Sequence, residues 1–135
     1  MTPEDALGAL ATRRGESFIV RRHDIVEACR RMRDAGWEHL MLITAVDWRD
    51  RWEVLYHLVK HGERRIVCLR VDLHYQDPTI PSVTGVWPGA GWHERETFDL
   101  MGIVFEGNPD LRRILLPQDY EGHPLRKEVL YGNRS

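Results

Sequence analysis

Three consecutive segments with alternating side chains restrict the fold of this chain more than any other feature. Residues 38–48, 51–60 and 65–74 each alternate between two sets of side chains, as a strand does when successive side chains point to opposite faces. Short polar links at 49–51 and 61–64 join them, which predicts antiparallel neighbours. Both sets in each segment are partly apolar, so we expect helices or a partner to cover much of both sheet faces.

The residues before this meander predict two helices and one further strand. Residues 2–14 begin with the hydroxyl, proline and acid that are typical of a helix start, and this helix is predicted to stop at Gly15. Residues 17–21 predict a short strand, and residues 24–35 predict a second helix. A helical crossover of this kind permits the first strand to pair in parallel with the meander.

Proline and glycine interrupt the chain after residue 76. Residues 77–91 predict a loop, whereas residues 92–101 (WHERETFDLM) have helical spacing and end before Gly102, a natural helix stop. In residues 105–135, prolines and glycines prevent long helices and strands, yet apolar side chains are frequent and five acids balance five bases. Such a segment is best explained by wrapping over a surface, either of this domain or of another subunit.

Together these elements predict an α+β fold in two layers. A mixed, mostly antiparallel sheet of about four strands packs with helices, and a C-terminal helix and an extended tail broken by Pro and Gly follow. Residues 1–104 are predicted to form the α+β domain, including the helix at 92–101. Residues 105–135 are predicted to form a tail that wraps a partner.

Composition argues against several function classes. The net charge of −2 and the pI of about 6.4 provide no basic field for nucleic acid or an anionic membrane. Five tryptophans among many arginines leave single-stranded nucleic-acid binding as an alternative. The longest apolar run, residues 40–46, is far too short to span a bilayer, so direct membrane insertion is not expected. Nucleotide-binding and serine-hydrolase motifs are absent from the sequence.

One enzymatic hypothesis rests on the helix at 92–101. His93, Glu96 and Asp99 follow one another at helical spacing, and such a set could hold a metal or perform acid–base chemistry. The zinc-protease pattern H-E-x-x-H is not completed, because Thr97 stands in place of its second histidine. The preferred interpretation is an acidic helix face that pairs with arginines.

Residues 84–128 resemble the characteristic motif of the C subunit of bacterial NADH–quinone oxidoreductase, the respiratory complex I family. The same module occurs in membrane-bound [NiFe]-hydrogenase and formate hydrogenlyase complexes. Three groups of residues carry the resemblance. The pattern E-R-E-x-x-D is matched by Glu94, Arg95, Glu96 and Asp99, and the pattern L-R-R-I-L by Arg112 and Arg113. The pattern D-x-x-G-x-P-L-R-K is matched by Asp119, Arg126 and Lys127.

The resemblance implies a non-catalytic scaffold subunit in the peripheral arm of a proton-translocating NADH:quinone oxidoreductase, on the cytoplasmic side of the membrane. It implies that the nine matching residues dock on other peripheral-arm subunits, chiefly the quinone-site subunit. No catalytic, cofactor or metal site is expected in this chain, because FMN, iron–sulfur clusters, NADH and quinone would bind other subunits. The alternative within the resemblance is an accessory subunit of a membrane-bound [NiFe]-hydrogenase or formate hydrogenlyase complex.

Overall fold

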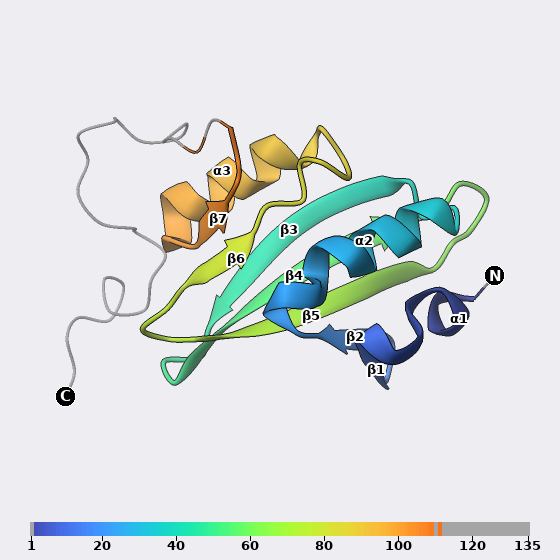
Figure 1. Cartoon of the computed structure of the whole chain (residues 1–135), viewed down its shortest axis with the longest axis horizontal. Coiled ribbons are helices and arrows are strands. Elements are labelled where there is room, and N and C mark those ends of the chain that lie inside the picture. The colour runs from blue at the N-terminus through green and yellow to red at the C-terminus, as the bar shows by residue number, and fades with distance from the viewer. Residues whose placement is uncertain (1, 110, 112–135) are drawn as a thin grey trace.

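The three alternating segments form the centre of the sheet in a computed structural model, which describes residues 2–109 and 111 (Figure 1). β3 (His39–Asp47), β4 (Arg51–Val59) and β5 (Ile66–His74) are antiparallel neighbours, as predicted. The strand order is β1-β2-β5-β4-β3, so β3 is an edge strand. The α+β class and the mixed, mostly antiparallel sheet are confirmed.

The N-terminal region differs from the prediction. α1 (Pro3–Leu7) ends at Gly8, whose φ of 55° is left-handed, and a 3-10 turn at Gly8–Leu10 leads into β1 (Ala11–Arg14). β1 pairs antiparallel with β2 (Ser17–Val20). The predicted helix through Arg14 is therefore wrong after Leu7, because pairing with β2 holds this segment extended. The sheet has five strands instead of about four.

The predicted crossover is present. A 3-10 turn at Arg22–Asp24 and α2 (Ile25–Asp34) connect β2 to the meander, and β2 pairs in parallel with β5. α2 lies across one face of the sheet (Figure 1) and buries four side chains, those of Ile25, Ala28, Cys29 and Met32. This face of the sheet forms most of the core together with α2.

Burial separates the two faces of the sheet. The core face of β4 carries fully buried side chains: Trp52, Val54, Tyr56 and Leu58. Its other face carries mostly half-buried ones: Arg51, Leu55, His57 and Val59, with Glu53 buried. We call this second face the open sheet face. Among the described residues, the expectation that helices cover much of both faces holds only for the core face.

A smaller unit lies beyond β3 (Figure 1). β6 (Thr79–Pro81) and β7 (Val104–Glu106) form a two-stranded parallel sheet, and α3 (Ala90–Met101) lies between them in sequence. The structure thus places a short strand where a loop was predicted at 77–91. β7 crosses the predicted boundary at 104/105, and its Phe105 is buried in the core. The division into a domain and a wrapping tail stays a prediction.

Candidate protein interface at helix α3

α3 is the helix predicted at 92–101, and it begins two residues earlier. Gly102 ends it in the left-handed conformation (φ 81°), and its N–H donates to the carbonyl of Phe98 at 2.9 Å. The helix packs along edge strand β3, where the Thr97 hydroxyl is 3.4 Å from the carbonyl oxygen of Ile43. α3 therefore covers part of an edge that would otherwise present unpaired backbone groups.

Glu94 is the central polar residue of this helix. Its side chain is fully buried, and it accepts three hydrogen bonds, from the Ser82 hydroxyl (2.7 Å), the Val83 N–H (2.8 Å) and the Asn108 amide (2.8 Å). These bonds connect α3 to the loop before it and to the segment after β7. Burial raises the pKa of Glu94, while the three hydrogen bonds act in the opposite direction.

The charge of Glu94 also affects the pKa of two other buried groups. Burial raises the pKa of the Cys29 thiol and of the Tyr56 hydroxyl, and the negative charge of Glu94 adds to both shifts. Both groups are therefore neutral near pH 7. A neutral, fully buried thiol is a poor nucleophile, so Cys29 acts in this core as a small apolar side chain.

The outer side of α3 carries an aromatic residue and a base in contact. Trp92 is 56% exposed, and the Arg95 guanidinium lies 5.7 Å from the centre of its ring. An exposed tryptophan beside an arginine is a combination that is enriched where proteins bind one another. The docking role predicted for Arg95 fits this position, whereas nothing in the sequence distinguishes Trp92 from the other four tryptophans.

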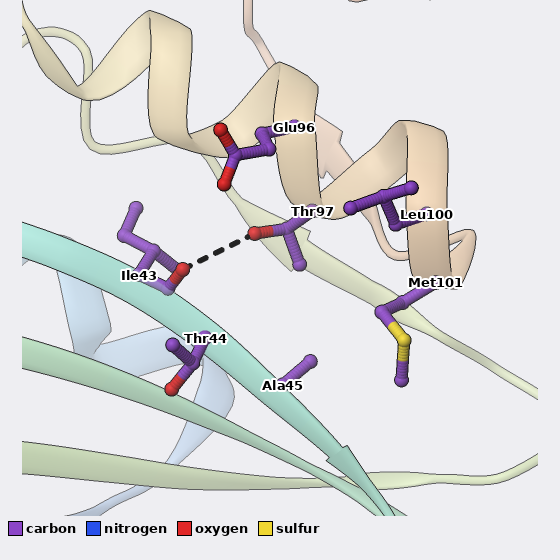
Figure 2. Close-up of a pocket in the computed structure, with 7 residues that line it drawn as sticks. All are labelled: Ile43, Thr44, Ala45, Glu96, Thr97, Leu100 and Met101. Atoms are coloured by element: carbon purple, nitrogen blue, oxygen red, sulfur yellow. Dashed lines mark hydrogen bonds between the residues drawn. The ribbon is translucent and has the colours of Figure 1, made fainter. Parts of the chain in front are cut away.

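Glu96 and Leu100 face a groove between α3 and β3 (Figure 2). The groove has a volume of about 160 Å³, and its other lining residues are Ile43, Thr44, Ala45, Thr97 and Met101. Glu96 is half-buried, and within the described part of the chain its carboxylate has no hydrogen bond or ion pair. The groove thus combines apolar walls with a carboxylate that pairs with no described residue.

The structure does not assemble the alternative enzymatic site. No group of three or more His, Cys, Asp or Glu side chains that could hold a metal occurs among residues 2–109 and 111. Each step of three residues turns about 60° around a helix, so His93 and Asp99 point about 120° apart. Asp99 is also fully buried, whereas Glu96 lines the groove. The hypothesis that His93, Glu96 and Asp99 form one site is therefore wrong.

The nine residues assigned to docking divide into two groups. Five lie outside the described residues: Arg112, Arg113, Asp119, Arg126 and Lys127. Of the other four, Glu94 and Asp99 are fully buried, whereas Arg95 and Glu96 are half-buried. The hydrogen bonds found for Glu94 are internal, so the structure supports a bracing role for it. A docking role for the set stays a prediction.

Sequence reasoning missed the partners of Glu94. Ser82 and Val83 lie in a segment predicted only as a loop, and Asn108 lies beyond the predicted domain boundary. It also missed the ion pair between Glu53 and Arg70 on the open sheet face, in which the Arg70 Nε donates to Glu53 at 3.0 Å. The register that places those two side chains on the same face was the available signal.

Comparison with known proteins identifies relatives over most of the chain. The model of the family described as the respiratory-chain NADH dehydrogenase 30 kDa subunit matches residues 18–134. The NADH-quinone oxidoreductase C subunit of Roseiflexus sp. (strain RS-1) is 45% identical, with 96% of this chain and 78% of the relative covered. The protein of the same name from Paramagnetospirillum magneticum (strain ATCC 700264 / AMB-1) is 42% identical, with 93% and 66% covered.

Two solved structures share the fold. A trypsin-resistant fragment (1–134) of Nqo5 is 30% identical, with a TM-score of 0.68, and the match covers 80% of this chain and 95% of that one. A chain of the membrane-bound sulfane sulfur reductase, an archaeal respiratory membrane complex, is 26% identical, with a TM-score of 0.81, and 93% and 81% are covered. Among the described residues, no helix has the length and apolar character needed to cross a membrane.

Proposed function

This chain belongs to the family of the respiratory-chain NADH dehydrogenase 30 kDa subunit, and from that premise we propose that it is a scaffold that docks on the quinone-site subunit. The chain is a subunit of an NADH-quinone oxidoreductase complex, not an enzyme by itself, and its partners are other subunits of that complex. The proposal adds which neighbour it binds and what it does there.

The observation that carries the proposal is the extent of the family match. Residues 18–134 include both the α+β region and the segment with Arg112, Arg113, Asp119, Arg126 and Lys127. A family match that spans both the folded region and this chain's proline-broken, charge-balanced segment fits a protein that is anchored by its domain and holds a neighbour with its tail. In this proposal, residues 110–135 of the predicted tail wrap the quinone-site subunit, since residues 105–108 pack within this chain.

The geometry supports a scaffold role in a second way. Glu94 connects α3 to two separate loops through three hydrogen bonds, so Trp92, Arg95 and Glu96 project from a braced helix. A binding surface on a braced element loses little conformational entropy when it docks. In the proposal, FMN, iron–sulfur clusters, NADH and quinone bind other subunits of the peripheral arm, on the cytoplasmic side of a proton-translocating complex.

Native purification tests this proposal. The tagged chain is isolated from detergent-solubilised membranes of its own cell, and the copurifying proteins are identified by mass spectrometry. We expect the quinone-site subunit together with a flavin-containing, NADH-oxidising subunit. Recovery of the chain without any redox subunit would contradict the proposal.

A second candidate is an accessory subunit of a membrane-bound [NiFe]-hydrogenase or formate hydrogenlyase complex. It is favoured by the similarity to a chain of the archaeal sulfane sulfur reductase complex, which is described as a membrane-bound respiratory complex. The same purification separates the two candidates, because the second predicts [NiFe]-hydrogenase subunits and no NADH-oxidising flavoprotein.

A further inference from the structure

The open sheet face carries an apolar strip that no described helix covers. We define the apolar strip as five aliphatic side chains on three adjacent strands: Leu42, Val46, Leu55, Val59 and Ile66. The register places them on one face, since Thr44 pairs with Leu55 and Ile66 pairs with Val59. Ile66 is 44% exposed and the others are half-buried. Apolar side chains that stay accessible together on one sheet face are typical of a surface that binds something.

Charges beside the apolar strip are already paired within the chain. Arg70 donates two hydrogen bonds to the buried carboxylate of Glu53, and the Arg51 Nε lies 3.7 Å from Asp72. A partner that approached these residues would find no unmatched charge to satisfy. They therefore give no preference for an acidic or a basic occupant.

The opposite margin of the apolar strip does favour an occupant of one charge. There β3 meets α3 at the groove of Figure 2, and Thr44, one of the residues lining the groove, is exposed with its side chain on the open sheet face. On the helix side, the groove is lined by the apolar Leu100 and by Glu96, whose carboxylate has no ion pair with any described residue. An occupant that lies across the strip and reaches this carboxylate needs an apolar side and one base.

We infer that the groove and the apolar strip together receive one segment of a neighbouring subunit, apolar toward the strip and carrying an arginine or lysine for Glu96. The inference rests on the proposed function, because it requires a neighbour in a complex. A second copy of this chain fits less well. In a two-fold interface the same patch meets itself. The two Glu96 carboxylates, which pair with no described residue, would then face Arg70 and Arg51, which Glu53 and Asp72 already engage.

Thiol labelling tests whether the surface is covered. The chain has two cysteines, of which Cys29 is fully buried, so Thr44→Cys in a Cys68→Ser background places one reactive thiol at the groove. We expect a maleimide to react readily with the free folded chain. In the purified complex the reaction should be at least about tenfold slower, because the reagent must wait for the interface to open.

The matched control is Glu63→Cys in the same background, in the exposed link between β4 and β5. It should react equally fast in the free chain and in the complex. If Thr44→Cys also reacts equally fast in both, the surface is uncovered and the inference is overturned. If the unmodified chain does not copurify with a complex at all, the proposed function fails instead, so the two failures are distinguishable.

Photo-crosslinking from the same position identifies the occupant. Thr44 is replaced by p-benzoylphenylalanine, the complex is irradiated, and the joined peptide is sequenced by mass spectrometry. An apolar peptide of another subunit that contains an arginine or lysine supports the inference. A peptide from a second copy, from residues 110–135 of the same chain, or without a base overturns it.

Charge reversal tests the role of Glu96 separately. Glu96→Arg should lower recovery of the neighbouring subunits several-fold, and Glu96→Gln should lower it less, because the amide can still accept a hydrogen bond from the base. Glu63→Arg makes the same change in charge at an exposed site away from the groove and should leave recovery unchanged. Equal recovery with Glu96→Arg and Glu63→Arg would contradict the assigned role.

Discussion

At the scale of single residues, Glu94 decides whether α3 stays in place. Glu94→Ala removes the acceptor of the buried Val83 N–H and of the hydrogen bonds from the Ser82 and Asn108 side chains, at an expected cost of about 2–4 kcal/mol in the free energy of unfolding. Glu94→Gln keeps the shape and part of the bonding, so it should cost clearly less. Chemical denaturation of both variants measures the difference, and equal stability of Glu94→Ala and the unchanged chain would refute the bracing role.

The same residue predicts a pH dependence. Its folded pKa is raised above the ordinary value of 4.5, chiefly by burial, so the folded chain binds this proton more tightly than the unfolded chain. The resulting stabilisation is complete below the ordinary pKa and is lost as the pH rises through the folded pKa. We therefore compare the free energy of unfolding of the unchanged chain with that of Glu94→Gln. The difference should favour the unchanged chain more at pH 5 than at pH 7.

Denaturation of both proteins at these two pH values gives the comparison, because groups that titrate alike in both cancel. A relative stability that is greater at pH 7 would show that the hydrogen bonds from Ser82, Val83 and Asn108 outweigh burial and lower the pKa.

At the scale of elements, the β3–β4 hairpin contains a strained connection. Arg49 has a φ of 70°, a left-handed conformation that a residue with a Cβ adopts at a cost and glycine adopts freely. Arg49→Gly and Arg49→Ala both remove the side chain, so the difference between them isolates the backbone. We expect the glycine variant to be more stable by about 1 kcal/mol. An alanine variant of equal stability in thermal denaturation would contradict this explanation.

The elements also show what sequence can predict. The meander and α3 were predictable because each contains enough residues of one periodicity, and Gly102 marks the end of α3. β1 was not, because Ala11–Arg14 is four residues long and is held extended only by its pairing with β2. β6 and β7 have three residues each and pair across an intervening helix. The local sequence of either segment does not specify a pairing with a strand more than 20 residues away.

The site was predictable in part for the same reason. The helix at 92–101 was predicted, and so was the presence of Glu94, Arg95, Glu96 and Asp99 on it. The burial of Glu94 could not be read from its neighbours, because its hydrogen-bond partners lie 11 to 14 residues away in loops. The groove at Glu96 depends on how α3 packs against β3, which helical periodicity alone does not specify.

At the scale of the whole molecule, the predicted docking arginines should matter for assembly more than for folding. Arg112→Ala or Arg126→Ala removes one member of a charge pair that we place at a subunit interface. If its partner carboxylate is left buried and unpaired, binding should weaken by about 2–5 kcal/mol. Arg64→Ala, in the exposed β4–β5 link, is the matched control. If the free chain loses as much folding stability as the complex loses binding energy, these arginines are internal braces.

A scaffold that docks on the quinone-site subunit should hold that subunit without help from the rest of the complex. The decisive experiment is coexpression of the tagged chain with the quinone-site subunit alone, from the same genome, followed by size-exclusion chromatography with light scattering. We expect a stable one-to-one complex that forms without the NADH-oxidising subunit. Elution of the tagged chain by itself, in a preparation where the quinone-site subunit is folded, would contradict the scaffold role.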